Sequence, residues 1–483
     1  MSTNNNIINT LRATLLIIFM LPSIGYSQAV YKLNEVDKAA EPFVGLPALF
    51  EYFNNNLQIP IASAAKGLNG RVFVQGIVEL DGSMSEVKVV RALEPGADAE
   101  ALRLFKLYKA WRPALKDGKA VRQEVIYPMI VRTEPVATYN DDEKTIIEYF
   151  DKKHEPTVDE STYKFRNLIP VDEYGHARAD VLYQEFKGKN WKTQKTIPFT
   201  KEEQWTKLIS DTGLDSVKSF RSMATDSDFD SSYEVVTRQE NGQLLAFQVY
   251  RNRMGPPVFS KYYYRNGLLK EVQEVGEEVA ITNWYENGML QEKKILGKGG
   301  LKIMENWSKD GTALVTAGNG MAKISGNSEA GKQVAEEGKV VDGYKDGTWV
   351  STGPDGTVLK EELYDKGKFV SGKIRKGTEL VAFEEQSQTA GYKGGPTELY
   401  KFLGKNLNFG SYNLPANDKV IVTFIVATDG SLDDIKIEKS ISALIDKEVL
   451  RVVNLSNGNW EPAIINGEKA RVRYTLPINV QSK

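Results

Sequence analysis

Cysteine is absent from this chain of 483 residues, and histidine occurs only twice. Without cysteine there are no disulfides, thiol nucleophiles, iron–sulfur clusters or thiolate-bound zinc. The lipid-modified cysteine of a bacterial lipoprotein is excluded as well. His154 and His176 stand apart in polar, turn-like stretches, where a surface histidine is the simplest interpretation. We therefore expect no cofactor and no metal site.

An excess of charge of either sign is also lacking. The 62 Lys and Arg residues nearly balance the 64 Asp and Glu residues, which leaves a net charge of −2. Such a balance gives no basic surface for nucleic acid or for an anionic membrane. The sequence contains no H-E-x-x-H, G-x-S-x-G or phosphate-binding glycine loop. We expect no enzyme, no nucleic-acid partner and no evident small-molecule substrate.

One acidic cluster invites a calcium interpretation. Asp226, Asp228 and Asp230 alternate as the first ligands of a calcium loop do. That loop needs Gly at its sixth position and Glu at its twelfth, where this chain has Ser231 and Thr237. A solvated linker is therefore the favoured interpretation.

Long apolar runs are scarce, and the longest candidate lies at the N-terminus. Arg12 precedes the apolar run 15–21, which Pro22 interrupts and small residues up to Ser27 follow. The run is near the ~7–15 residues of a signal-peptide core and short of the ~20 that span a bilayer. This pattern predicts export to the periplasm or cell envelope with cleavage after Ser27. A retained segment would instead anchor the protein in the inner membrane.

The two ends of the chain resemble each other. Residues 57–131 align with 407–480 with single-residue slips only, which is the mark of an internal repeat. The shared positions fall in three short motifs, which read D-G-S, D-x-E-x-L-R and W-x-P-A. The residues of the first and third motifs to which we assign structural roles are Asp81, Gly82, Trp111 and Pro113 in one copy and Asp429, Gly430, Trp460 and Pro462 in the other.

Each copy predicts the same order of elements. A proline, Pro47 or Pro396, starts an apolar pattern of helical spacing, and period-two strands follow around an Asp-Gly hairpin turn. Asp98 or Asp446 then opens a second helix, a tryptophan seals helix against sheet, and a last strand completes the unit. We expect an α+β fold with helices on one face of a three-stranded antiparallel sheet.

These motifs resemble the TonB C-terminal domain family of Gram-negative envelope proteins. The resemblance is carried by the G-x-V-x-V pattern that ends in D-G-S at 70–83, by D-x-E-A-L-R at 98–103 and by W-R-P-A at 111–114. It implies recognition of an extended peptide by strand addition, with TonB-dependent outer-membrane transporters or other envelope proteins as partners. Ile59-Pro60 precedes the first strand in copy one, whereas copy two has Phe409-Gly410. We therefore expect copy one to bind more tightly.

The final strand of each copy, 123–132 and 471–480, contains a proline. Proline cannot donate to a β-ladder, so it belongs on an edge strand, where a partner strand can be added. The predicted partner-binding residues are Gln123, Val125, Tyr127, Pro128 and Ile130 in copy one, and Tyr474 and Pro477 in copy two.

The middle of the chain has a different periodicity. Asn-Gly or Asp-Gly dipeptides at 241, 266, 287, 310 and 355 each precede a short alternating stretch, as in successive β-hairpins. The pattern resembles MORN-type repeats and predicts an elongated β-array. Residues 146–151 and 163–180 favour strands that begin this array, and 201–219 favours a short helix.

The sequence thus predicts a leader (1–27), copy one (28–135), a linker with an α+β segment (136–230), hairpin repeats (231–375) and copy two (384–481). The expected fold is a pair of α+β end domains joined by a mostly β array. The expected function is non-enzymatic protein binding in the envelope, including TonB-dependent transport. Two alternatives stay open: a structural scaffold with self-associating ends, and an anchored TonB-like energy transducer if the leader is retained.

Overall fold

A computed structural model describes residues 29–136, 138–210, 213–225, 232–251, 256–327, 333–385, 387–409, 418–465 and 467–480. The leader 1–27 and the acidic cluster at Asp226, Asp228 and Asp230 lie outside these residues. The described chain is mostly β, with a few short helices. None of the helices in the described ranges is long and apolar enough to cross a membrane.

The first end domain packs helices against a five-stranded sheet of order β1-β7-β3-β4, with β6 paired to β7. The predicted antiparallel trio is β4-β3-β7, and the short β1 adds to it in parallel. A separate two-residue pair joins β2 to β5. The elements are β1 (Val30–Tyr31), η1 (Leu33–Glu35), β2 (Glu41–Pro42), α1 (Leu46–Asn56), α2 (Ile61–Ala64), β3 (Asn69–Val78), β4 (Met84–Arg91), α3 (Pro95–Leu107), β5 (Trp111–Arg112), β6 (Ala114–Lys116) and β7 (Lys119–Arg132).

The second end domain repeats this plan in a smaller form. Its main sheet is three-stranded and antiparallel, in the order β31-β30-β35. Two short pairs, β29 with β32 and β33 with β34, complete it. The elements are β29 (Gly391–Tyr392), α4 (Gly395–Asn406), β30 (Asp418–Val426), β31 (Leu432–Lys439), α5 (Ala443–Leu455), β32 (Trp460–Glu461), β33 (Ala463–Ile465), β34 (Glu468–Ala470) and β35 (Val472–Val480).

The helix starts follow capping chemistry. Pro47 and Pro396 lie in the first turns of α1 and α4, as predicted. Helix α3 begins before Asp98, because the carboxylate of Glu94 accepts hydrogen bonds from the amides of its first turn. In α5 the cap is Ser442 rather than Asp446. The expectation that the two aspartates open these helices was wrong; they lie inside the first turn.

The segment between the first domain and the hairpins is β-structured. Five strands form a sheet of order β12-β11-β10-β9-β8, and the described part of the segment contains only a one-turn 3₁₀ helix, η2 (Glu160–Thr162). The strands predicted near 146 and 163 therefore belong to a separate sheet and do not begin the array. They are β8 (Tyr139–Asn140), β9 (Thr145–Phe150), β10 (Phe165–Pro170), β11 (Val181–Lys187) and β12 (Asn190–Ile197).

The predicted helix at 201–219 was wrong. Strands β13 (Phe199–Ser210) and β14 (Gly213–Ala224) form an antiparallel hairpin, in register from Phe199 opposite Ala224 to Ser210 opposite Gly213. Residues 203–208 alternate between exposed and half-buried, which is the period of a strand. Pairing of β14 with the next strand of the large sheet favours this hairpin over local helical propensity.

Sixteen consecutive strands, β13 to β28, form one antiparallel sheet, which confirms the predicted series of hairpins. The remaining strands are β15 (Tyr233–Gln239), β16 (Leu244–Tyr250), β17 (Phe259–Tyr263), β18 (Leu269–Val275), β19 (Val279–Trp284), β20 (Leu290–Gly297), β21 (Gly300–Trp307), β22 (Ala313–Thr316), β23 (Asn319–Asn327), β24 (Gln333–Val341), β25 (Tyr344–Thr352), β26 (Val358–Asp365), β27 (Lys368–Lys376) and β28 (Glu379–Phe383).

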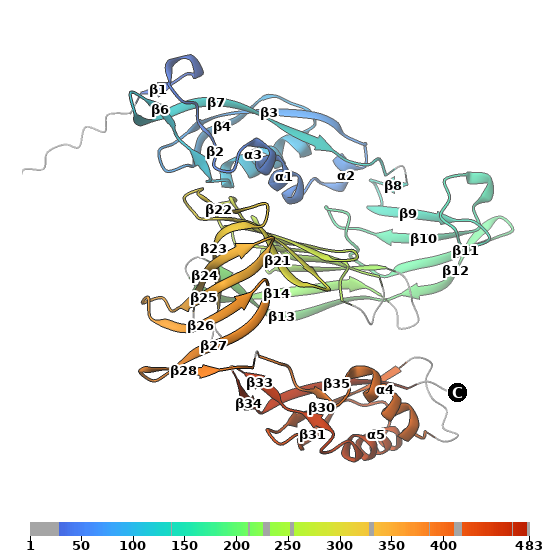
Figure 1. The fold of residues 1–483 in the computed structure, drawn as a ribbon. Coiled ribbons are helices and arrows are strands. Elements are labelled where there is room, and N and C mark those ends of the chain that lie inside the picture. Colours follow the sequence, from blue (N-terminus) through green and yellow to red (C-terminus); the bar gives the residue numbers. More distant parts are fainter. Residues whose placement is uncertain are drawn as a thin grey trace, which may run out of the picture.

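The large sheet lies between the two end domains, with the helices of the first domain turned toward it (Figure 1). One continuous hydrophobic core contains buried residues of the first domain and of strands β15 to β20. Tyr52 of α1 lies 5.5 Å from Trp284 of β19 between ring centroids. The buried core of the second domain consists of its own residues alone. The first copy therefore shares a hydrophobic core with the array, whereas the second copy has a separate core.

Candidate functional site

The D-G-S turn has the same structure in both domains. The carboxylate of Asp81 accepts hydrogen bonds from the amide (2.9 Å) and hydroxyl (2.6 Å) of Ser83, and Asp429 accepts the same pair from Ser431. The serine hydroxyl is the main reason why the pKa of each aspartate lies below its ordinary value. These turns are therefore structural.

The glycine of the turn allows a close approach to the tryptophan strand. Gly82 has φ +79, and a Cβ there would lie 2.6 Å from the carbonyl oxygen of Trp111. At Gly430, with φ +84, the corresponding distance to Trp460 is 2.2 Å. Both tryptophans are fully buried, which confirms them as core residues. Pro113 and Pro462 each separate the short tryptophan strand from the next strand, β6 or β33.

The predicted edge residues of β7 divide between its two faces. Gln123 and Val125 are buried on the core side, and the ring of Tyr127 lies 4.8 Å from that of Trp111. Pro128 and Ile130 lie on the opposite face and are half-buried. The side chains of the first three residues are thus engaged with the domain itself.

The first domain also covers part of its own edge. Strand β1 pairs with β7 in parallel, with Val30 opposite Arg122 and Tyr31 opposite Gln123. The amide of Ala40 donates to Gln123 Oε1 (2.6 Å), and the Tyr127 hydroxyl donates to the Ala40 carbonyl (2.9 Å). The prediction that Gln123 lies on an open edge was therefore wrong, because the chain upstream of α1 already occupies that position.

The second domain leaves the equivalent edge uncovered. Strand β35 ends its sheet, and within the described residues only β30 pairs with it. Pro477 is exposed and pairs with Ile421 of β30. Pro128 pairs with Phe73 of β3 at the equivalent position of the first domain. Because proline has no amide hydrogen, its nitrogen belongs on the side away from the ladder. The backbone groups of Thr475 and Arg473, two and four residues earlier, then face the same open side.

A cleft of about 750 Å³ lies beside β35. Its walls are the segment that leads into α4, the start of α4, strand β33 and the first half of β35. Tyr474 lines it and packs its ring 4.9 Å from that of Trp460. Burial raises the pKa of Tyr474, so this phenol stays neutral at physiological pH. The cleft therefore offers an apolar wall next to an exposed strand edge.

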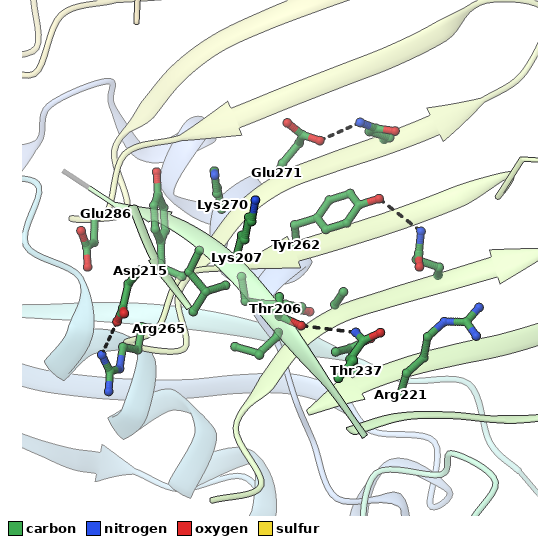
Figure 2. A pocket seen from close by; sticks show the side chains of 18 residues that line it. Thr206, Lys207, Asp215, Arg221, Thr237, Tyr262, Arg265, Lys270, Glu271 and Glu286 are labelled. Atoms are coloured by element: carbon green, nitrogen blue, oxygen red, sulfur yellow. Dashed lines mark hydrogen bonds and ion pairs between the residues drawn. The ribbon is translucent and has the colours of Figure 1, made fainter. Parts of the chain in front are cut away.

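A second hollow of about 840 Å³ lies in the large sheet, between β13–β14 and β16–β18. Figure 2 shows that charges of both signs line it, including Lys207, Arg221, Lys270 and Glu271. Arg265 and Asp215 form an ion pair of 2.6 Å within it. This mixture of signs singles out no ligand class.

The two histidines have local partners. The Nδ1 atom of His154 lies 2.8 Å from the Tyr183 hydroxyl, and that of His176 lies 3.0 Å from Glu234. Among the residues that the structure describes, no group of three or more His, Cys, Asp or Glu side chains is placed to hold a metal ion.

Comparison with known proteins matches both end domains to one family. The family described as Gram-negative bacterial TonB protein C-terminal matches residues 55–130 and 415–480. No curated protein matches the chain. Residues 55–130 and 415–480 are therefore two copies of the TonB C-terminal domain. The family is not an enzyme family, and its presence supports a TonB-like protein of the Gram-negative envelope.

Proposed function

We propose that this protein is a non-enzymatic binding protein of the Gram-negative envelope that takes up an extended partner segment as an added strand along β35. The observation that carries the proposal is the uncovered edge of β35 beside an apolar cleft, on a domain with a core of its own. In strand addition the backbone provides affinity, and pockets for alternate side chains provide specificity.

The second domain is the better candidate for binding. From the sequence alone, we expected the first domain to bind more tightly. Its edge is occupied by β1 at Arg122 and Gln123, whereas the corresponding part of β35 has no such strand among the described residues. Pro477 limits an added strand to the N-terminal part of β35, which is also the part that lines the cleft.

The partner we propose is another envelope protein, with TonB-dependent outer-membrane transporters as the first class to test. Its segment should alternate apolar residues toward Leu399 and Tyr474 with polar residues toward solvent. Arg471 and Arg473 are each held by an aspartate of β31 at 2.8 Å, so acidic residues are not required for recognition. Export with cleavage after Ser27, and a MORN-type spacer role for the array, belong to the same proposal.

The scaffold alternative is favoured by one observation. The first domain is packed into the large sheet through a shared core, so the array and this domain form one rigid support for the second. A scaffold needs no peptide ligand, which separates it from strand addition. The anchored transducer depends on the leader, and an intact Met1 in the mass spectrum of the mature protein would favour it.

The experiment places a photo-crosslinking residue in the full-length protein, at Arg473 in one sample and at Glu124, the equivalent position of β7, in another. Each sample is incubated with peptides from the periplasm-facing segments of outer-membrane transporters. We expect crosslinks at Arg473 and not at Glu124, because β1 lies on that part of β7. Thr475→Pro should weaken binding at least tenfold, because it removes an outward amide without removing a ladder bond, whereas the control Thr475→Val should bind normally. Equal binding by both variants would exclude strand addition at β35.

A further inference from the structure

In both domains, the segment that precedes the first long helix pairs with equivalent residues of the domain. An isolated bridge joins Lys38 to Leu115 in the first domain and Gln388 to Ile464 in the second. A two-residue strand then pairs beside the tryptophan, β2 with β5 and β29 with β32. These equivalent pairs fix the alignment of the two incoming segments, residue by residue.

Upstream of the bridge the two segments diverge. Val30 precedes Lys38 by eight positions and lies in β1, on the edge of β7. The residue eight positions before Gln388 is Leu380, which lies in β28 and pairs with β27 as part of the large sheet. The counterpart of β1 is therefore used as the last strand of the array.

The edge positions themselves are equivalent. Val78 pairs with Gln123 in the first domain, and Val426 pairs with Val472 in the second. Gln123 and Val472 thus correspond, and the place that β1 takes on β7 has its match at the start of β35. That place borders the cleft beside Val472 and Arg473.

Strand β1 is held by few contacts. Val30 is 39% exposed, and neither Val30 nor Tyr31 is among the buried residues of the first domain's core. The pairing covers two residues. The ammonium of Lys116 lies 4.3 Å from the centroid of the Tyr31 ring, which adds a cation–π contact. The domain core does not depend on β1, so the strand can leave without unfolding it.

We propose that β1 is an internal ligand that occupies the first domain's binding edge and thereby regulates it. Among the described residues, the edge of β35 then carries no such strand, whereas the equivalent edge of β7 opens when β1 is released. This inference rests on the proposed function of β35. It also describes the ligand: a short extended segment that runs parallel to the edge strand and carries a β-branched residue followed by an aromatic one.

The test uses the full-length protein and a synthetic peptide of residues 29–35 as the probe. Val30→Cys with Arg122→Cys tethers β1, since the chain has no other cysteine and the disulfide is unique. Val30→Gly with Tyr31→Gly releases it, and Tyr31→Ala weakens it. The matched control is Leu33→Gly, because Leu33 is 69% exposed and lies two residues after β1. The number of bound peptides is measured by calorimetry.

We expect one bound peptide for the wild type, the oxidised tether and the control, and two for the released variant. Tyr31→Ala should show the second site with weaker affinity, and the tethered variant should keep a single site after reduction, as the wild type does. Adding Thr475→Pro should remove one site from every variant. A wild type without any site, together with a released variant with one, would refute binding at β35 while supporting the role of β1. A second site in the oxidised tether, or its absence from both the released variant and Tyr31→Ala, would overturn the inference.

Discussion

The two end domains contain the same ion pair in different surroundings. Glu100 and Arg103 of α3 join the amide of Gln58 to the carbonyl of Asn56, and Glu448 and Arg451 make the same bonds to Asn408 and Asn406. In the first domain the guanidinium also donates to the Gly267 carbonyl of the array (3.4 Å). The hydrogen bonds of Arg451 in the described part of the chain stay within its own domain, and its side chain is 49% exposed.

The first domain makes further polar contacts with the array. Lys261 donates to the carbonyl of Asn55 (2.6 Å), Lys293 pairs with Glu51 (2.8 Å), and the Lys109 amide donates to the Asn287 carbonyl (2.9 Å). Among the residues that the structure describes, one ion pair, Lys376 with Glu468, joins the array to the second domain. One domain fold thus occurs twice, once packed into the array through a shared core and once with a core of its own.

The largest expected effect comes from the buried tryptophans. Trp111→Ala and Trp460→Ala should each lower the free energy of unfolding by about 3–5 kcal/mol, as large-to-small core changes do. Calorimetry of the full chain should show that Trp111→Ala also lowers the unfolding temperature of the array, because the first domain and the array share a core. Trp460→Ala should change only the second domain. An equal shift of the array by both variants would contradict the difference between the domains.

The next largest effect on stability should distinguish Arg103 of the first domain from Arg451 of the second. Burial opposes the charge of Arg103, but its hydrogen bonds to Glu100 raise its pKa, so the guanidinium stays charged inside the interface. Arg103→Met leaves Glu100 buried without its partner and should cost about 3 kcal/mol in urea unfolding. Arg451→Met, at the exposed pair, should be far milder. Similar losses for both variants would show that the Arg103 site is not part of the docking interface.

The stability of the first domain, which packs against the array, should depend on pH. Burial lowers the pKa of Lys261 to about 8 from an ordinary value of 10.5. Between these values the unfolded chain binds more protons than the folded one, so stability should rise from pH 8 toward pH 10, by about 1–3 kcal/mol. Tyr52 and Tyr108 act in the opposite direction above pH 10, because burial raises their pKa values.

Denaturant unfolding at several pH values, followed by tryptophan fluorescence, measures this dependence. Lys261→Met removes the titrating group and should flatten the rise between pH 8 and pH 10. Lys376→Met, at the exposed contact with the second domain, is the control and should leave the rise unchanged. A rise that persists in Lys261→Met would assign the effect to another group.

The smallest expected effect on stability comes from the indole Nε1 atoms of Trp111 and Trp460. Trp460 Nε1 donates to the hydroxyl of Ser456 (3.0 Å), whereas the buried Nε1 of Trp111 has no partner among the described residues. Ser456→Ala should therefore destabilise the second domain by about 1–2 kcal/mol in thermal unfolding. Leu455→Ala, at a side chain 52% exposed, is the control. A neutral Ser456→Ala would mean that this hydrogen bond does not distinguish the domains.

Much of each end domain is predictable from sequence, because its signals are local. The Asp-Gly-Ser turns, the first-turn prolines and the period-two strands each depend on neighbouring residues, and the structure has them. The Asn-Gly and Asp-Gly turns of the array are local in the same sense: Gly242, Gly267 and Gly288 adopt φ of +88, +86 and +91.

The features that distinguish the two domains depend on contacts far apart in the chain. Tyr52 reads as an ordinary apolar residue of a helix, and only the fold brings Trp284 to it. Strand β1 has two residues and no periodicity, so its place on β7 leaves no mark in the sequence. The alternation of exposed and half-buried side chains at 203–208 exists only in the folded sheet, where β14 pairs with β13 and β15. Burial is predictable from a pattern; the identity of the covering element is not.

Residue-resolved amide hydrogen exchange of the full-length protein tests the central claim most directly, since it compares the two edges without any ligand. We predict slow exchange for the outward amides of Arg122 and Glu124, beside which β1 pairs, and fast exchange for the outward amide of Arg473, the equivalent of Glu124. The amides of β3 and β30, each paired on both sides, serve as internal references. Equal protection of the two edges, or faster exchange at β7 than at β35, would contradict the account.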